Sequence, residues 1–419
     1  MKYLHHILIA YFFSTCVGCS RLDNNIFDET PAERMNNALQ NTTNVLTAAP
    51  SGWLMEYYAT PDSSGYPILV RFMKNGQTVV AAQNEFTTNK AYQTDSSVYS
   101  MIGDEGPVLT FNSYNSVLHA FSTPENPDGI GLNGDYEFIV KSTTPDTIRL
   151  QGKKRGSTIL LSRLASNTNW KAYIEANNQL DNTLLGGNSP KLTLKVENVS
   201  YYFSKADTHI FKVTPGTSSV SSFHIPFIVT QKGIKFYSDI TLNGKNFRSF
   251  NLNADQSALV SNENSAYKIT GIDDLALYFL TNVVNWKLTR SGMSASFQAS
   301  FDQLTQYLQS SENAQNIAVS IKYSSVRKSY VLSISYSTGS GYWDRNLDMG
   351  VSSSGKNSLT ISYKSTGDAE ALKLYNNSQA LKDIVTNLSN IFTLSTAASI
   401  NPQTITLTKN GSLWVSITQ

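Results

Sequence analysis

Cysteine, histidine and net charge are all scarce in this chain of 419 residues. Its two cysteines, Cys16 and Cys19, lie close together near the N-terminus, so we expect no disulfide in the rest of the chain. The 33 lysines and arginines nearly balance the 31 aspartates and glutamates. The chain therefore has no strong positive electrostatic field that would attract nucleic acid. Aromatic residues make up 11% of the chain, which excludes strong disorder.

Recognisable catalytic and metal-binding motifs are also missing. The chain has no H-E-x-x-H, nucleophile elbow, P-loop or G-x-G-x-x-G sequence. His119, His209 and His224 are interpreted as packed or surface histidines, with His119 in a strand. The oxygen-rich segment 125–135 does not have EF-hand spacing and is interpreted as turns. We therefore expect a protein that is not an enzyme, with no catalytic residue, metal or cofactor.

The N-terminus predicts an export signal and a lipid anchor. A basic Lys2 precedes a short, largely apolar run that is too short and interrupted to span a bilayer. The run ends at Val17-Gly18-Cys19, and small residues before a cysteine are what lipoprotein signal peptidase requires. Residues 1–18 are thus predicted to be a signal peptide, Cys19 the lipidated residue, and 19–29 a tether. This predicts an outer-membrane lipoprotein, with its face of the membrane left open.

The rest of the chain predicts a mainly β protein with a few helices. Short apolar strands alternate with turn signals, which favours antiparallel β-sandwich or open-barrel units, each accompanied by amphipathic helices. We expect an N-terminal β domain with a leading helix at 30–167, a middle β region at 168–270 and a C-terminal α+β region at 271–419. The helices are expected within 30–50, 169–180, 301–308 and 380–392. Asn-Gly pairs at 75–76, 243–244 and 410–411 predict hairpin turns.

One segment carries a candidate binding site. Tyr342 and Trp343 follow a glycine-rich stretch that is interpreted as a loop, and sugar rings stack on such aromatics. The next three residues, Asp344, Arg345 and Asn346, have side chains that bond hydroxyl groups. The alternative is that Trp343 folds back over a sheet. Trp53, Trp170, Trp286 and Trp414 lie in strand or helix patterns and are expected in the core.

Several segments resemble a known family. They are Phe27–Arg34, Ser51-Gly52-Trp53, Gly106–Phe111 with Asn115 and His119, Gly134–Phe138, Gly152-Lys153-Lys154, and more weakly Pro226-Phe227 and Gly233–Phe236. In these segments the chain resembles an uncharacterised Bacteroidetes lipoprotein family, catalogued as domain of unknown function 4302. The resemblance implies a nutrient-capture accessory of a TonB-dependent transporter and its surface lipoprotein. It supplies no catalytic residues.

These observations together predict a lipid-anchored envelope protein that binds without catalysis. Its expected partners are the membrane, through Cys19, the transporter with its surface lipoprotein, and a glycan or peptide ligand. Two alternatives stay open. One is a hydrolase of glycans or peptides, because a glycosidase needs only two facing carboxylates. The other is a structural or adhesin protein of the cell surface.

Overall fold

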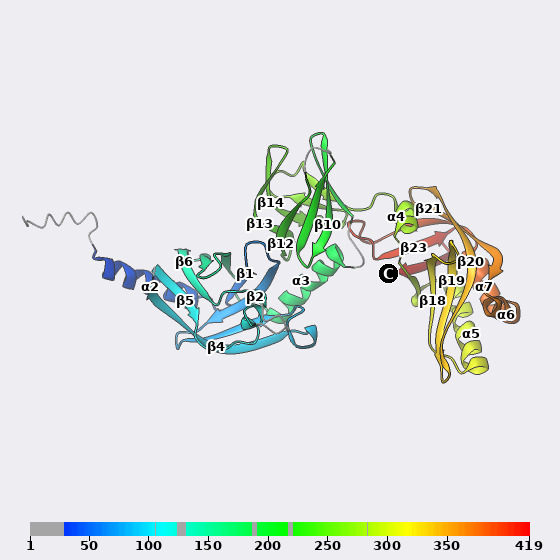
Figure 1. Ribbon diagram of the computed structural model, residues 1–419, viewed down its shortest axis with the longest axis horizontal. Helices are drawn as coiled ribbons and strands as arrows, with labels where there is room; N and C mark the ends of the chain where they lie inside the picture. The colour runs from blue at the N-terminus through cyan, green and yellow to red at the C-terminus, as the bar shows by residue number, and fades with distance from the viewer. Residues whose placement is uncertain (1–28, 105, 124–130, 187–190, 217–220, 283) are drawn as a thin grey trace, which may run out of the picture.

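Three closed antiparallel sheets follow one another along the chain (Figure 1). The computed structural model describes residues 29–104, 106–123, 131–186, 191–216, 221–282 and 284–419. We name the sheets barrel 1 (β1–β8), barrel 2 (β9–β16) and barrel 3 (β17–β24). The mainly β class with a few helices is confirmed. Each sheet is closed by pairing of its first and last strands, rather than left open or split into a sandwich.

The three barrels share one up-and-down topology, in which every strand pairs with its sequence neighbours. Barrel 1 consists of β1 (Trp53–Tyr58), β2 (Gly65–Phe72), β3 (Gln77–Ala82), β4 (Gln93–Asp104), β5 (Gly106–Phe111), β6 (Glu137–Thr143), β7 (Thr147–Gly152) and β8 (Thr158–Arg163). Barrel 2 consists of β9 (Leu192–Val196), β10 (Val199–Asp207), β11 (Ile210–Pro215), β12 (Phe223–Val229), β13 (Gly233–Leu242), β14 (Lys245–Leu252), β15 (Ala258–Ser261) and β16 (Lys268–Thr270). Barrel 3 consists of β17 (Trp286–Met293), β18 (Gln315–Ser324), β19 (Ser329–Thr338), β20 (Gly341–Gly355), β21 (Ser358–Gly367), β22 (Ile391–Ser395), β23 (Thr404–Lys409) and β24 (Leu413–Thr418).

Side chains fill the barrel interiors, as is usual for eight strands. In β1, Trp53, Met55 and Tyr57 alternate along the strand and all lie in the barrel 1 core. Aromatic rings fill much of barrel 2, where Phe211 and Phe227 stack with centroids 4.2 Å apart. The closed interiors therefore serve as hydrophobic cores, and ligand sites are to be sought between the barrels and on their surfaces.

Helices cover the barrels and connect them. They are α2 (Pro31–Thr47), α3 (Trp170–Leu185), α4 (Leu275–Thr281), α5 (Ala295–Glu312), α6 (Ala369–Asn377) and α7 (Gln379–Leu388). Thr30 and Glu33 form the predicted capping box of α2, with Thr30 N donating to Glu33 Oε2 at 2.8 Å. Among the helices of the described residues, none has the length and apolar character needed to cross a membrane.

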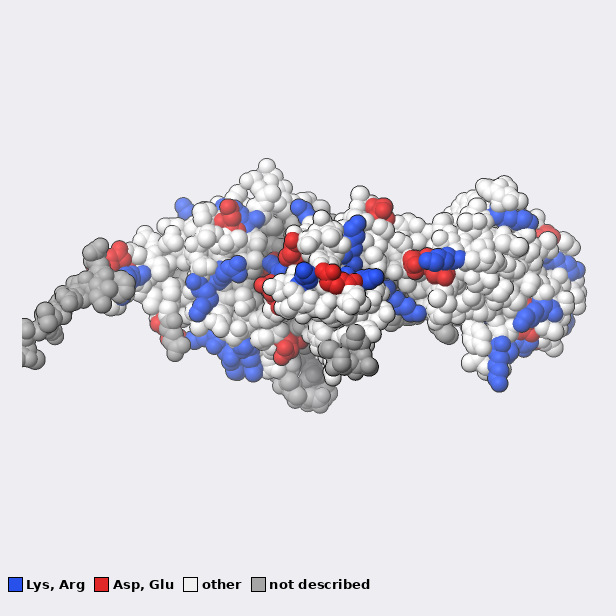
Figure 2. Space-filling model, turned by 90° about the horizontal axis from the view of Figure 1, so that it is seen from above, with Lys and Arg blue, Asp and Glu red and all other residues white. Residues whose placement is uncertain are grey.

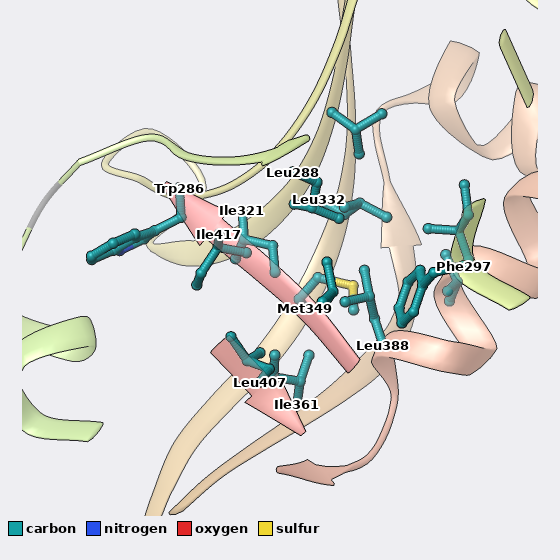
Figure 3. Close-up of a cluster of buried hydrophobic side chains, with 14 of the residues drawn as sticks. Trp286, Leu288, Phe297, Ile321, Leu332, Met349, Ile361, Leu388, Leu407 and Ile417 are labelled. Carbon is teal, nitrogen blue, oxygen red and sulfur yellow. The ribbon is translucent and has the colours of Figure 1, made fainter. Parts of the chain in front are cut away.

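Barrel 3 builds part of its core from helices that the chain inserts between strands. Phe297 of α5 and Leu388 of α7 pack against Leu332 and Met349 of the sheet (Figure 3). The prediction that the first of these helices begins after Ser300 was wrong. It begins after Ser294, and Ser300 lies inside it with its hydroxyl donating to Ser296 O.

Barrels 2 and 3 are joined by a loop that precedes β23. Ile400 of this loop is fully buried and belongs to the core of barrel 2, although its neighbours continue into barrel 3. Its backbone N–H donates to Gln256 O at 3.1 Å, and Asn401 Nδ2 donates to Gly186 O at 2.8 Å. Barrel 3 is thus held on barrel 2 by the inserted Ile400 side chain as well as by the chain segment that connects β16 to β17.

Candidate functional site

A cleft of about 310 Å³ lies where barrel 1, barrel 2 and helix α3 meet. Barrel 1 contributes Tyr66 and Pro67 of β2 and residues of the loop between β3 and β4, including η1 (Thr88–Lys90). Helix α3 contributes Asn177, Asn178 and Asp181. Barrel 2 contributes Lys205 near the end of β10, the turn that follows it and Val229. Ligand sites favour such junctions between domains.

The two barrels that form the cleft are in close contact. A Cβ added to Gly65 of β2 would lie 2.7 Å from Phe227 O of β12 and as close to the Tyr58 ring, so only glycine fits there. Lys235 Nζ of β13 reaches both carboxylate oxygens of Glu56 in β1, at 2.9 and 2.7 Å. The Tyr58 and Tyr237 rings meet at 4.8 Å. This tight contact holds the two walls of the cleft in a fixed relation.

His209 links the two walls directly. Its Nδ1 lies 2.7 Å from Gly65 O of barrel 1, and its Nε2 lies 3.2 Å from Asp181 Oδ1 of α3. The ring is buried and also contacts Tyr66 and Phe227. The ring thus lies between an oxygen of barrel 1 and an oxygen of α3. His209 therefore has a structural place in the cleft.

The charged groups of the cleft balance in sign but differ in pairing. Glu85 Oε1 accepts a hydrogen bond of 2.8 Å from Tyr66 Oη, and Asp181 faces His209. Burial, and secondarily the Glu85 charge, raises the pKa of Tyr66 well above its ordinary value, so its hydroxyl stays a donor. The ammonium groups of Lys90 and Lys205, both exposed, have no partner within the described residues. The lysines are the free charges of the cleft.

Amide side chains line the deeper part. Asn177 is 2% exposed, and its Nδ2 donates to Val229 O at 3.0 Å. Its Oδ1 is buried and has no hydrogen-bond partner within the described residues. Leaving a buried acceptor unpaired costs about 1–3 kcal/mol. The neighbouring Asn178 and Gln83 add further donors and acceptors.

The loop on the barrel 1 side holds an unfavourable backbone conformation. Asn89 and Lys90 both have positive φ, at 54° and 53°. A left-handed conformation costs a non-glycine residue roughly 1–2 kcal/mol, and such strain gathers at functional sites. The loop is fixed by Gln83 Nε2, which donates to Lys90 O at 3.1 Å.

The predicted site at 342–346 lies in strand β20 and not in a loop, so that part of the prediction was wrong. Tyr342 is 69% exposed, whereas Trp343 has the Arg345 guanidinium 5.0 Å from its ring and donates through Nε1 to Thr338. The strand pairs with β19 over its first half, placing Trp343 opposite Tyr336. Residues 341–344 are exposed on both faces of the strand, and Arg345 and Asn346 are half-buried.

Asp344 and Arg345 of this segment already have side-chain partners in the protein, whereas the buried Asn346 Oδ1 has none within the described residues. Asp344 is bonded by Lys322 at 2.7 Å and by Ser333 and Ser335, which together lower its pKa although burial opposes this. Arg345 lies against Tyr336 and Glu312. The Asn346 backbone N–H donates to Asp368. The structure brings all five residues together, with the Tyr342 ring as the most exposed group.

The remaining sequence candidates lie elsewhere. His119 begins the short 3₁₀ helix η2 (His119–Phe121), so the strand predicted there was wrong. It stacks on Tyr136 at 5.0 Å, and its Nδ1 accepts from Asn115 N. His224 is exposed on barrel 2.

Cys19 lies outside the described residues, as does most of the 125–135 segment. Within the described residues, no three His, Cys, Asp or Glu side chains gather closely enough to hold a metal ion.

Several segments that carry the family resemblance meet in barrel 1. The Asp135 carboxylate accepts from Arg155 N at 2.7 Å, and a Cβ on Gly152 would lie 2.2 Å from it. Burial raises the pKa of Asp135, although its backbone hydrogen bonds oppose this. The Asn115 side chain accepts from the backbone N–H groups of Val117 and Leu118. These residues therefore fix turns of the barrel.

A family model, Domain of unknown function (DUF4302), matches residues 23–254, which include barrel 1, α3 and most of barrel 2. The chain belongs to this family. The matched segment holds every residue that lines the cleft. No curated protein matches the chain.

Solved structures that match include three DNA polymerase III beta chains. The one from Streptococcus pneumoniae TIGR4 is 10% identical, with 92% of this chain and 97% of that chain covered and a TM-score of 0.16. A putative beta subunit from Eubacterium rectale is 8% identical, with the same coverage and TM-score. The beta subunit from Pseudomonas aeruginosa is 8% identical, covers 91% and 97%, and has a TM-score of 0.14.

Proposed function

We propose that this protein is a lipid-anchored capture protein of the cell envelope, which binds a glycan or peptide without catalysis. Its lipid would be carried by Cys19, and its ligand would lie in the cleft between barrels 1 and 2. In this proposal it serves a TonB-dependent transporter and its surface lipoprotein at the outer membrane. The observation that carries the proposal is the cleft, with two rigidly joined walls and free hydrogen-bonding groups.

Binding without catalysis is supported by how the cleft's reactive groups are occupied. A general base needs a nitrogen or oxygen within reach of the proton it removes. His209 has both ring nitrogens engaged, and Glu85 and Asp181 each have one oxygen engaged. Within the described residues, the His209 ring nitrogens face Gly65 O and Asp181 Oδ1 and no serine, threonine or cysteine hydroxyl or thiol.

A tethered capture role is supported by the arrangement of the molecule. Helix α2 lies at one end of the row of barrels, and barrel 3 lies at the other (Figure 1). The segment between Cys19 and α2 is about a dozen residues, which extends to at most ~40 Å. A short tether keeps the effective ligand-site concentration near a transporter high, so weak contacts are sufficient for capture.

The proposal is tested by filling the cleft with one side chain. The soluble chain from Ser20 onward is applied to glycan and peptide arrays, together with Asn178→Trp, whose indole would occupy the cleft. Gln179→Trp is the matched control, because Gln179 is the next residue of α3, is exposed and does not line the cleft. We expect Asn178→Trp alone to abolish binding. Binding retained in Asn178→Trp would contradict the cleft as the site.

The exposed Tyr342 and Trp343 rings are a second candidate surface for glycan stacking. Trp343→Ala in the same assay separates the two sites. If binding is lost in Trp343→Ala and kept in Asn178→Trp, capture takes place at barrel 3 instead.

A further inference from the structure

We infer that the cleft between barrels 1 and 2 selects an uncharged, hydroxyl-rich ligand, a short neutral saccharide, over peptides and acidic saccharides. This inference rests on the proposed function and names the ligand class of the same site. It is argued from the closure of the sheets, the charges of the cleft, its amide groups and one exposed ring.

Closure of the sheets removes the commonest way of holding an extended peptide. Peptides are often bound as an added strand at an open sheet edge, where main-chain groups pair. Within the described residues, each strand of the three barrels has a strand neighbour on both sides. Pro67 and Val229 are the aliphatic side chains of the cleft lining, and Tyr66 adds an aromatic ring.

The charges of the cleft disfavour a ligand of either sign. Lys90 and Lys205 would attract an acidic group, but Glu85 and Asp181 face the same space. A third carboxylate, Asp207, lies next to Thr208 and accepts from its backbone N–H. On the face of the molecule shown in Figure 2, charges of both signs are scattered among wide uncharged areas. No strong field therefore draws an ion toward the cleft.

A hydroxyl group suits every polar side chain of the cleft, because it both donates and accepts. The second oxygens of Glu85 and Asp181 can accept from it, and the two lysines can donate to it. Asn177 has an acceptor oxygen with no partner, at the buried end of the lining. Asn178 offers an amide at the surface of the cleft. A saccharide supplies several hydroxyls at fixed angles, which this set can satisfy together.

An aromatic ring stands beside the cleft. Phe86 is 37% exposed, and its ring centroid lies 5.7 Å from that of Tyr66, which lines the cleft. An exposed ring next to hydrogen-bonding groups is suited to the apolar C–H face of a sugar ring. The volume of about 310 Å³ is at the lower end for ligand pockets, which fits a short saccharide rather than a long chain.

The inference is tested by calorimetric titration of the soluble chain with three ligand sets. These are neutral oligosaccharides, oligosaccharides of uronic acids, and peptides of three or four residues. We expect the tightest binding from a neutral oligosaccharide, with affinity changing less than about twofold between 50 and 500 mM NaCl. Asn178→Ala and Phe86→Ala are each expected to weaken it about fivefold. Gln179→Ala serves as the control outside the cleft.

The outcomes separate this inference from the proposal beneath it. Tightest binding of a peptide or an acidic saccharide, abolished by Asn178→Trp, would overturn the neutral class and keep the cleft. An affinity for the neutral oligosaccharide that falls tenfold or more with added salt would also overturn the neutral class. If no ligand binds in a way that Asn178→Trp abolishes, the cleft proposal itself fails, and this inference fails with it.

Discussion

At the scale of single residues, burial and pairing set the charge states that the folded protein requires. His119 is half-buried between Tyr114 and Tyr136, and this burial lowers its pKa below the ordinary value of 6.5. The unfolded chain therefore takes up a proton at higher pH than the folded protein does. The stability that comes with the neutral ring is complete above about pH 6.5 and is lost as the pH falls below it.

His119→Gln is expected to reduce the pH dependence of stability. The urea midpoint of the wild type should fall between about pH 7 and pH 5, and it should fall less in the variant, because a titrating group has been removed. His224→Gln is the matched control, since His224 is exposed. Equal slopes for His119→Gln and the wild type would contradict the neutral, buried state of His119.

The pKa of Asp348 in barrel 3 is also lowered, but by an ion pair rather than by burial. Arg327 binds both of its oxygens, at 2.5 and 2.7 Å, and this holds the pKa of Asp348 below its ordinary value of 3.8. The stability from this pair is present above the ordinary pKa and is lost as the pH falls through the lowered one.

Asp348→Asn is expected to destabilise the protein by about 1–2 kcal/mol at pH 7, because it leaves Arg327 without its bidentate partner. Asp302→Asn removes the partner of Arg290 from an exposed pair and should change little. Thermal unfolding of both variants makes the comparison. Equal effects would show that burial of the Asp348 carboxylate is unimportant.

At the scale of elements, the Asn-Gly turns at 243–244 and 410–411 require positive φ at both residues. Asn410 and Gly411 between β23 and β24 have φ of 51° and 71°, which matches the mirror-image turn that suits a twisted hairpin. Gly411→Ala is therefore expected to cost about 1 kcal/mol in unfolding free energy, with no steric contribution because nothing lies within 4 Å of the added Cβ.

Gly339→Ala is the control for this prediction. Gly339 also has open space around it, but no positive φ is recorded for it. Urea unfolding should separate the two variants. An equal loss of stability in both would argue against backbone conformation as the cause.

Structural features that depend on neighbouring residues were predictable from the sequence, whereas those that depend on distant residues or on a misleading local pattern were not. The capping box of Thr30 and Glu33 and the Asn-Gly turns depend on neighbouring residues, and their elements were predicted correctly. The strand through Tyr342–Asn346 was missed because its outward residues are polar and it follows a glycine-rich turn, which together resemble a loop. Barrel closure was missed because it pairs β1 with β8, more than a hundred residues later.

At the scale of the whole molecule, the cleft could not be predicted because its parts are distant in the sequence. It joins the loop near Glu85, one face of α3 and the turn at His209. His209 was interpreted as a packed histidine, and no local pattern indicates that its ring nitrogens reach Gly65 and Asp181. The nearest signal was the weak family resemblance at 226–236, whose residues Phe227 and Lys235 contact barrel 1.

Ile400 provides a test of how the barrels are joined. Ile400→Ala is expected to cost about 2–4 kcal/mol, because the side chain is fully buried in the core of barrel 2. The variant should also show a larger radius of gyration by small-angle X-ray scattering, since barrel 3 loses its inserted contact. Ile391→Ala, at an exposed site, should change neither the unfolding free energy nor the radius of gyration. Unchanged scattering would show that other contacts hold the barrels in place.

The central claim is that ligand binds where barrels 1 and 2 meet. Hydrogen–deuterium exchange of the soluble chain, with and without a saturating neutral oligosaccharide, tests it most directly. Bound ligand should slow exchange in residues 83–90, 177–181 and 205–209, which line the cleft, and leave residues 338–346 unaffected. Slower exchange at 338–346 with none at the cleft would contradict the claim and move the site to barrel 3.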